Sequence, residues 1–478
     1  MRAIAVLLVS ILCLFGCHQP LPNAEIRFAI AQAPLTLDPR YATDAASERV
    51  NRLIYQPLVD FDANSRVVPA LADWVQQDAL HYHFTLKPEG RIFHDGSRLR
   101  AGDVVATYRS LLSLKDAPHA AEFANIAGIE ALSDDKVAFT LHHPDAQFPA
   151  RLIVGILPAA LIARQHDFAH HPVGSGPIRF VAWNRALKLE RIADRQSIVL
   201  EEVRDPTVRV LKLLRGEVDL LQGDLPPELV AYLKRQPGIQ VLESPGTNFS
   251  YLGFNLQDPL LKNPLVRQAI AAAIDRQSLI SHALVGGTRS ATAILPPEHW
   301  AGNPELPEIA YNPQQARRWL QQTGIKLPLK LTLKTSTDAQ RVRLATIMQQ
   351  QMKPAGIDLD IRSLDWGTFF DDVKHGKFQL YGLTWVGIKT PEIYRLAFHS
   401  DSMPPAGANR GRLQDAELDA LINRQDWKAV TARVQDLMPY VPLWYEGQSA
   451  AMRRGISGYQ PAHDGNWDAL ATVKKQFN

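Results

Sequence analysis

The sequence predicts a mixed α/β protein that folds into several domains. Short apolar segments with strand-like alternation are interleaved with amphipathic segments of helical period. The chain has 478 residues, of which 46% are hydrophobic, and this length suffices for roughly two to four domains. No internal repeat with a period of roughly 20 to 50 residues is visible, so a repeat architecture is not expected.

The alternation of strands and helices is clearest in the first third of the chain. In HYHFTL every second residue is apolar or aromatic, which predicts a half-buried strand. RAGDVVATYRSLLSL has apolar residues at helical spacing, and Asp103 falls in its first turn, where a carboxylate is favourable. The predicted strands are residues 25–31, 81–86 and 136–143, and the predicted helices are residues 46–59 and 100–114.

Segments rich in glycine and proline mark two predicted domain boundaries. HPVGSGPIRF, residues 171–180, is the strongest predicted crossover. A second boundary lies near residue 263, where Asn263 can cap a helix with Pro264 at its first position. We expect the crossovers at Gly174 to Pro177 and at Gly253 to Asn255 to act as hinges between domains.

Charge and cysteine content exclude several classes of function. The formal net charge of +3 is small and its basic residues are scattered, so no nucleic-acid partner is predicted. The two cysteines, Cys13 and Cys17, lie at the start of the chain, so the body of the protein has no cysteine for disulfides, metal sites or nucleophilic catalysis.

Motif searches give no sign of an enzyme or of a cofactor. The sequence contains neither a G-x-x-x-x-G-K-[ST] phosphate loop nor an H-E-x-x-H zinc motif, and VGSGP lacks the first glycine of a nucleophile elbow. His142 with His143 is interpreted as an exposed pair, because adjacent side chains on a strand point to opposite faces. His94 and Asp95 lie in FHDGS, which has the composition of a turn.

The first residues have the pattern of a secretory signal. MRAIAVLLVSILCLFGC combines Arg2 with an apolar run that is too short for a membrane-spanning helix of about twenty residues. Its end, LFGC, resembles the lipobox of bacterial lipoproteins, which implies cleavage before Cys17 and lipidation of that cysteine. An ordinary signal peptide is the alternative. The predicted signal is residues 1–16, and residues 17–24 form a tether.

Five stretches of the chain form an ordered set from about residue 26 to the end. They are APLTLDPRYATDAASERVNRLIYQPLV, HYHFTLKPEGRIFHDGSRLRAGDVVATYRSLL, VGSGPIRF, YLGFNLQDPLLKNPLVRQAIAAAIDRQSLI and NRGRLQDAELDALI. Together they resemble the family 5 extracellular solute-binding proteins, the oligopeptide, dipeptide and nickel receptors of ABC importers. The resemblance implies a two-lobed type II periplasmic-binding-protein clamp with an extra domain in its N-terminal half.

The resemblance also implies domains that are discontinuous in sequence. One lobe, domain I, would comprise residues 24–55, 172–265 and 456–478. The extra domain, domain II, would span residues 56–171, and the opposite lobe, domain III, residues 266–455.

The resemblance places a ligand-binding strip at the segment LTWVGIKTPEIY. In peptide-binding relatives a Trp-x-x-Asp segment pairs with the peptide as an added strand, and its aspartate holds the α-ammonium. Trp385 matches the tryptophan, Val386 and Gly387 match the backbone-pairing residues, and Ile388 stands in place of the aspartate. The opposing strand would be Ala45, Ala46 and Ser47, and Tyr251 and Asn255 are further candidates for the cleft.

The missing aspartate changes the expected ligand. An α-ammonium buried beside Ile388 would be unpaired at a cost of several kcal/mol, unless another carboxylate were supplied. Free-amine peptides should therefore bind poorly, and an amide-containing or N-blocked compound fits better. Lys389 either meets a ligand carboxylate or is an exposed lysine at the end of a loop.

The function implied is that of the substrate-binding component of an ABC importer. It would capture a peptide-like or other small polar or amphipathic solute between its lobes and deliver it to a membrane permease with separate ATPase subunits. The protein would be a monomer in the periplasm or cell envelope, lipid-anchored to a membrane, without a cofactor. A scaffold or regulatory lipoprotein that keeps the clamp but does not transport is the alternative, and a hydrolase is disfavoured because no nucleophile and base are visible.

Overall fold

The fold is built on one long mixed sheet that runs through most of the molecule. A computed structural model describes residues 25–114 and 120–476. Among these residues, an eleven-stranded sheet has the strand order β15-β14-β16-β12-β17-β11-β1-β10-β9-β8, with β13 paired to β17. The strands are β1 (Ile26–Ile30), β8 (Ile178–Trp183), β9 (Leu187–Arg191), β10 (Ser197–Glu202), β11 (Leu220–Gln222), β12 (Ile239–Phe254), β13 (Arg289–Ser290), β14 (Leu329–Ser336), β15 (Ile357–Leu364), β16 (Leu380–Trp385) and β17 (Tyr440–Arg453).

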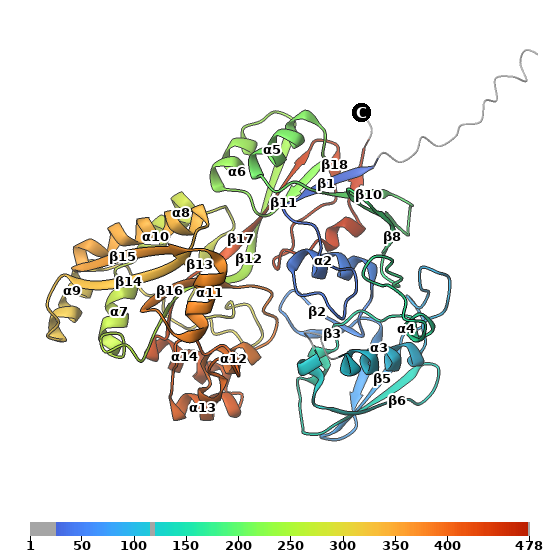
Figure 1. The fold of residues 1–478 in the computed structure, drawn as a ribbon, viewed down its shortest axis with the longest axis horizontal. Helices are drawn as coiled ribbons and strands as arrows, with labels where there is room; N and C mark the ends of the chain where they lie inside the picture. The colour runs from blue at the N-terminus through green and yellow to red at the C-terminus, as the bar shows by residue number, and fades with distance from the viewer. Residues whose placement is uncertain (1–24, 115–119, 477–478) are drawn as a thin grey trace, which may run out of the picture.

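The two ends of this sheet form separate bodies, which we call the β1 lobe and the β14 lobe (Figure 1). The β1 lobe contains β1 and β8–β11 with α2 (Ala45–Ile54), α5 (Pro206–Arg215) and α6 (Pro227–Lys234). The β14 lobe contains β14–β16 with the helices α7 (Pro264–Ala272), α8 (Arg276–Ala283), α9 (Pro313–Gln322), α10 (Ala339–Met352), α11 (Trp366–His375), α12 (Glu392–Phe398), α13 (Ala416–Asn423) and α14 (Trp427–Leu437).

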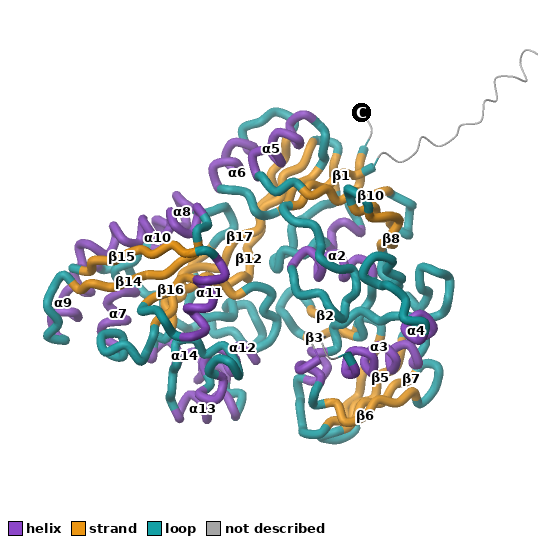
Figure 2. The backbone as a smooth tube through the Cα atoms, in the orientation of Figure 1, coloured by secondary structure: helices purple, strands orange, loops and turns teal. Residues whose placement is uncertain are grey.

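A third body, which we call the β5 domain, lies beside the β1 lobe (Figure 2). It contains a four-stranded antiparallel sheet of order β4-β5-β7-β6, packed against a helix, and a two-stranded sheet of β2 and β3. The elements are β2 (Val59–Phe61), β3 (Val67–Pro69), β4 (Ala72–Gln76), β5 (His81–Leu86), β6 (Ile126–Ala131), β7 (Lys136–Leu141), α3 (Ala101–Ser113) and α4 (Ala159–Ala163). The short strands β18 (Ile456–Ser457) and β19 (Lys474–Lys475) pair near the end of the chain.

Separate hydrophobic clusters fill these bodies. One cluster gathers Phe28 and Val50 with Trp467 from the end of the chain, so the β1 lobe is assembled from distant segments. A second is drawn only from residues 58–156 and fills the β5 domain. Two more, which include Ile270, Leu331 and Tyr394, fill the β14 lobe.

Most predicted elements of the first third are confirmed. The strands predicted over 25–31 and 81–86 appear as β1 and β5, and β5 shows the expected alternation of buried and more exposed residues. The helix predicted over 100–114 appears as α3, with the Asp103 carboxylate accepting from the Arg100 amide at 2.7 Å. Asn263 caps α7 by accepting from the Leu265 amide at 3.0 Å, with Pro264 at the first helical position.

The predicted crossover at residues 171–180 is packed against the end of α2. The Gly176 amide donates to the Ile54 carbonyl at 2.7 Å. A Cβ on Gly174 would lie 2.0 Å from that same carbonyl oxygen, so only glycine permits this approach. His94 joins the same place through Nε2, 2.9 Å from the Gly176 carbonyl, while Asp95 accepts from the Ser97 amide in a turn, as the sequence predicts.

The prediction that Gly253 to Asn255 form a crossover loop is wrong. Gly253 lies inside the sheet, paired with Tyr381 on one side and Tyr440 on the other. The two lobes are instead joined by β12 and β17, which are long enough to belong to both. Their pairing shifts in register between Ser244 and Asn248, which makes a bulge at residues 245–247.

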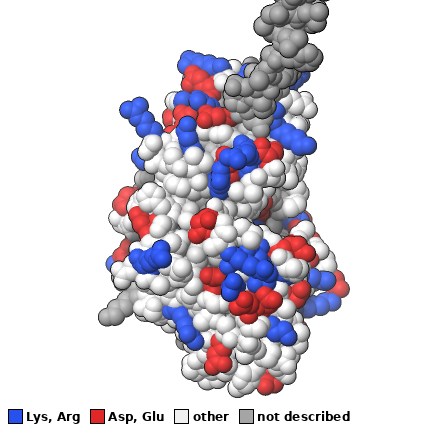
Figure 3. Space-filling view, turned by 90° about the vertical axis from the view of Figure 1, so that its right-hand side faces the viewer, with Lys and Arg blue, Asp and Glu red and all other residues white. Residues whose placement is uncertain are grey.

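The surface carries charges of both signs. On the face shown in Figure 3, Lys and Arg side chains are interspersed with Asp and Glu, without a broad area of one sign. Within the described residues, no helix is long and apolar enough to cross a membrane. The predicted signal, tether and Cys17 lie outside the described residues.

Candidate ligand-binding cavity between the lobes

A cavity of about 390 Å³ lies where the β1 lobe, the β14 lobe and the β5 domain meet. This volume falls near the lower end of the range for small-molecule sites, roughly 300–1,000 Å³. Helix α2 supplies one wall, the segment after β16 a second, and residues from the β5 domain a third. The lining residues include Ala45, Glu48, Arg49, Asn51, Arg52, Tyr55, Asp60, Phe61, Ile153, Val154, Val386, Gly387, Lys389 and Asp464.

The strand that the resemblance implies at Ala45, Ala46 and Ser47 is wrong, whereas the helix predicted from the residue pattern over 46–59 is confirmed as far as Ile54. They make the first turn of α2, whose N-cap Asp44 accepts from the Ser47 amide at 2.9 Å. Ala46 and Ser47 are buried, and the Ser47 hydroxyl accepts from the Leu35 amide at 2.9 Å. Of the three predicted residues, Ala45 alone lines the cavity.

The strip predicted from the resemblance reaches the cavity through its middle residues. Strand β16 ends at Trp385, and the chain then turns with Gly387 at a φ of +71°. Val386 and Gly387 line the cavity, and Val386 is 56% exposed. Ile388 is partly buried against the hydrophobic cluster of the β14 lobe. The cavity therefore meets the strip at Val386 and Gly387, whereas the Ile388 side chain packs against the β14 lobe.

Trp385 does not line the cavity. Its ring packs against Arg410 and Tyr251 instead. The Arg410 guanidinium lies 4.7 Å from the Trp385 ring centroid, and Tyr251 is stacked at 6.4 Å. Arg410 also donates from Nη1 to the Tyr251 hydroxyl at 3.1 Å. Tyr251 stacks on Tyr440 at 4.0 Å and is fully buried, so it supports the strip from behind.

Asn255 also lies outside the cavity. Its Nδ2 donates to the carbonyls of Gly376 at 3.2 Å and Phe378 at 3.0 Å. Its Oδ1 accepts from the Gln257 amide at 3.1 Å. These bonds fix the loop after β12, which explains Asn255 by local structure.

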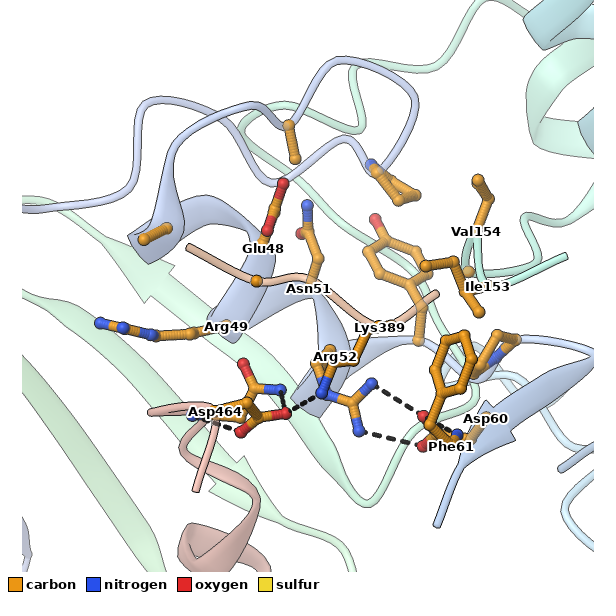
Figure 4. Close-up of a pocket in the computed structure, with 18 of the residues that line it drawn as sticks. Glu48, Arg49, Asn51, Arg52, Asp60, Phe61, Ile153, Val154, Lys389 and Asp464 are labelled. Carbon is orange, nitrogen blue, oxygen red and sulfur yellow. Dashed lines mark hydrogen bonds and ion pairs between the residues drawn. The ribbon is translucent and has the colours of Figure 1, made fainter. Parts of the chain in front are cut away.

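Lys389 and Asp464 form an ion pair across the cavity, from the β14 lobe to the β1 lobe (Figure 4). Burial opposes ionisation of Asp464, but the Lys389 ammonium outweighs it and lowers the pKa of that carboxyl. Asp464 also accepts from the Asn466 side chain at 2.8 Å. A carboxylate is thus supplied beside the strip after all, although it is already paired with a lysine.

Arg52 joins the β1 lobe to the β5 domain at the floor of the cavity. Its two terminal nitrogens donate to the two carboxylate oxygens of Asp60 at 3.0 and 2.9 Å, and Nη2 also reaches Asp468 at 3.0 Å. Burial lowers the pKa of the Arg52 guanidinium, but its two carboxylate partners raise it further, so the net shift is upward. Arg52 is therefore held as a charged, fully occupied cross-link.

His299 supports the strip from the β14 lobe. Its Nδ1 accepts from the Ala301 amide at 3.0 Å, so Nε2 carries the proton and donates to the Lys389 carbonyl at 3.0 Å. Burial lowers the pKa of the His299 imidazole. The amide of the next residue, Trp300, donates to the Asn64 carbonyl at 3.3 Å. This hydrogen bond joins the β14 lobe to the β5 domain.

Apart from Ala45, sequence reasoning missed the cavity-lining residues of α2 and those at the end of the chain. Asn51 and Arg49 lie on the polar side of an amphipathic helix, and that pattern was a usable signal for a cavity-facing surface. Nothing local in the sequence marks Asp464, which reaches the cavity only through the packing of the C-terminal segment on the β1 lobe. Within the described residues, no group of three or more His, Cys, Asp or Glu is placed to hold a metal ion.

Comparison with known proteins identifies the family. Residues 66–403 match the model described as bacterial extracellular solute-binding proteins, family 5 middle. The chain belongs to this family, and it has the two-lobed type II fold of its members. It is a solute-binding protein of the class that serves ABC importers.

Individual relatives bind peptides and related solutes. The chain is 28% identical over 477 residues to the probable di/tripeptide-binding protein 5 of Pseudomonas aeruginosa, covering 88% of this chain and 89% of the relative. It is 28% identical to the glutathione-binding protein GsiB of Salmonella typhi, covering 91% of each. The crystal structure of the substrate-binding protein CtaP from Listeria monocytogenes matches with a TM-score of 0.85 at 22% identity, covering 96% of this chain and 100% of that one.

Proposed function

We propose that this protein captures a short, amide-containing, peptide-like solute in the cavity between its lobes and delivers it to the permease of an ABC importer. The observation that carries the proposal is the cavity itself, which is lined both by Val386 and Gly387 of the strip and by residues of α2. Relatives named for di- and tripeptides and for glutathione support a ligand of this size and chemistry. The proposed ligand-contact residues are Ala45, Val386 and Gly387, with Trp385, Ile388 and Tyr251 supporting the strip.

The charges around the cavity favour a ligand without a net charge at this place. Asp464 is paired with Lys389, and Arg52 is paired with Asp60. A ligand ammonium or carboxylate placed at either of these two pairs would have to displace one partner and leave the other unpaired in a partly buried site. A neutral amide adds hydrogen bonds without that cost. This agrees with the expectation, drawn from Ile388, that an amide-containing or N-blocked ligand fits better than a free-amine peptide.

We further propose that ligand capture closes the lobes about β12 and β17. The bulge at residues 245–247 and the Glu446–Gly447 segment opposite it are the proposed hinge, in place of Gly253 to Asn255. The domain boundaries expected near residues 265 and 455 would then move to about this bulge. Residues 24–55, 172–245 and 447–478 would form domain I, 56–171 domain II, and 248–446 domain III.

We infer that the mature protein is a monomer in the periplasm or cell envelope, held on a membrane by lipid on Cys17. Support for the anchor comes from the LFGC sequence, and support for export from the family, whose members are extracellular. A non-transporting scaffold is not favoured, since the relatives are binding proteins and this chain keeps a cavity at the lobe junction.

Mass spectrometry of small molecules released by denaturing the purified protein tests the proposed function. We expect one class of amide-containing solute at close to one molecule per protein. Isothermal titration calorimetry with the synthetic compound should then give a single site. A protein that releases nothing, and that binds no member of a panel of N-acetylated di- and tripeptide amides, would contradict the proposal.

A further inference from the structure

Asn51 faces the cavity from α2 with both ends of its carboxamide unbonded. The residue is only 6% exposed, and within the described structure neither Nδ2 nor Oδ1 has a hydrogen-bond partner. It nevertheless lines the cavity. Buried polar groups are almost always paired, because leaving a donor or acceptor unpaired lowers stability. Within the described residues, the fold therefore supplies no hydrogen-bond partner for the Asn51 side chain.

The polar side chains around Asn51 are engaged elsewhere. Asp464 accepts from Lys389, and the Tyr55 hydroxyl donates to the Leu37 carbonyl at 3.0 Å. Among the described residues that line the cavity, Asn51 alone combines buried side-chain polar atoms with the lack of any bond to them. Its donor and its acceptor are both available to a molecule that enters the cavity.

We propose that Asn51 is a ligand-binding residue that recognises an amide group of the solute. Its Nδ2 would donate to the carbonyl oxygen of that amide, and its Oδ1 would accept from the N–H of the same or the adjacent amide. This inference rests on the proposed function and narrows it. The ligand class is an amide whose neighbouring groups are uncharged, such as an N-blocked peptide.

The surroundings of Asn51 favour an amide over a charged group. In Figure 4 its side chain lies between a charged end of the cavity, with Asp464 and Lys389, and an apolar end, with Ile153 and Val154. The charges of Asp464 and Lys389 already pair with each other, and Arg151, which lines the cavity two residues before Ile153, is paired with Asp145. A carboxamide side chain also matches a secondary amide as both donor and acceptor, which neither a carboxylate nor an ammonium can do.

Replacement of Asn51 by leucine gives a test that separates binding from folding. Asn51→Leu removes both polar atoms at similar volume, so its melting temperature should equal or exceed that of wild type. Asn303→Leu is the matched control, because Asn303 is 5% exposed but its Nδ2 donates to Thr431 Oγ1 at 3.0 Å. We expect Asn303→Leu to melt at a lower temperature and to bind like wild type.

Binding is measured by calorimetry with a panel of N-acetylated di- and tripeptide amides, starting from N-acetyl-trialanine amide. For the tightest member, Asn51→Leu should weaken binding by about tenfold or more, as expected for loss of one or two neutral hydrogen bonds. In a series of analogues, an ester oxygen replaces one peptide N–H at a time. We expect the replacement at one position of the ligand to weaken its binding to wild type. That difference should vanish in Asn51→Leu, because the acceptor is gone.

The outcomes distinguish this inference from the proposed function. Tight binding of a panel member by wild type, with equal binding by a folded Asn51→Leu variant, would overturn the role of Asn51 and leave the proposed function intact. No binding of any member by wild type would overturn the proposed function, the amide ligand class and this role together. Weakened binding in Asn51→Leu with an unchanged ester difference would mean that Oδ1 does not read the amide N–H.

Discussion

Ile388 occupies the position where peptide-binding relatives carry a carboxylate, and this one residue shapes the expected ligand preference. Asp464 lies near it but is already paired with Lys389. A ligand ammonium placed here would therefore compete with a lysine for the same carboxylate. The side chain of Ile388 packs on the β14 lobe and offers the ligand no charge.

We predict that N-acetyl-trialanine amide binds more tightly than trialanine with a free amine, by about tenfold or more, because an unpaired buried charge costs several kcal/mol. Ile388→Asp should narrow this ratio by restoring the carboxylate. Calorimetry on both proteins with both compounds is the measurement. Submicromolar binding of trialanine to wild type that requires its free amine would show that Asp464 has taken over the missing role.

His299 makes the strip sensitive to pH. Its pKa is lowered from the usual 6.5 in the folded state, so the unfolded chain binds the proton more readily. Stability contributed by neutral His299 is therefore complete above about pH 6.5 and is lost as pH falls below that value. Protonation would also remove the acceptor for the Ala301 amide, while Glu298 and Asp62 nearby favour the charged form.

We predict that the free energy of unfolding falls from pH 8 to pH 5 and that His299→Gln reduces the size of this fall. Urea titrations at each pH give the measurement. An equal fall in wild type and variant would assign the pH dependence to other groups, such as His94, whose pKa is also lowered by burial.

Cys17 is predicted to carry the lipid anchor. One acyl chain binds a membrane only marginally, whereas two or more make attachment stable. Cys17→Ser should therefore appear in the soluble fraction after cell lysis, with the folded body unchanged. Cosedimentation of the variant with membranes at the wild-type level would contradict the lipoprotein assignment.

At the scale of elements, β12 and β17 decide how the lobes are joined. Both strands continue from one lobe into the other, and their bulge is packed tightly. A Cβ on Gly246 would lie 1.6 Å from the Glu446 carbonyl oxygen. The neighbouring Thr247 amide donates to the His463 carbonyl at 3.2 Å, one residue before Asp464 of the cavity. The proposed hinge is thus in contact with the segment that supplies a cavity wall.

Gly246→Ala should lower the free energy of unfolding by about 1–3 kcal/mol, because the methyl group forces the two backbones apart. Gly382→Ala in β16 is the control. A Cβ there meets nothing within 4 Å, so its effect should stay within about 0.5 kcal/mol. Chemical denaturation of both variants gives the comparison, and equal stabilities would rule out close packing at the bulge.

Elements with local signals were predictable from the sequence, and elements set by long-range packing were not. The cap at Asn263 and the alternation in residues 81–86 depend on neighbouring residues, and both are confirmed. Gly253 to Asn255 were expected to be a hinge at a domain crossover, yet Gly253 is paired within the sheet on both sides, a long-range arrangement that no local pattern shows. Ala45 to Ser47 were assigned to a strand by analogy, although the Asp44 cap favours a helix.

The cavity was predictable only in part for the same reason. Val386 and Gly387 were found through the resemblance, and they line it. To predict Asn51 as a cavity residue, one would have to know which side of α2 faces the other lobe. To predict Asp464 as a cavity residue, one would have to know where the end of the chain packs. No local sequence pattern contains that information.

At the scale of the whole molecule, the three bodies meet around the cavity, where Arg52 ties the β5 domain to the β1 lobe. The Lys389–Asp464 pair joins the β14 lobe to the β1 lobe, and the Trp300 to Asn64 hydrogen bond joins the β14 lobe to the β5 domain. A bound solute would add contacts to both lobes at once and so shift the molecule toward its closed form. The proposed transport function depends on this coupling between binding and closure.

Small-angle X-ray scattering of the purified protein with and without N-acetyl-trialanine amide, or the tightest panel member, tests this claim most directly. We predict a smaller radius of gyration at a ligand concentration that calorimetry shows to be saturating. Asn51→Leu at the same concentration should show a smaller decrease in radius, in proportion to its lower occupancy by the ligand. An unchanged radius in wild type at full occupancy would contradict closure of the lobes over the solute.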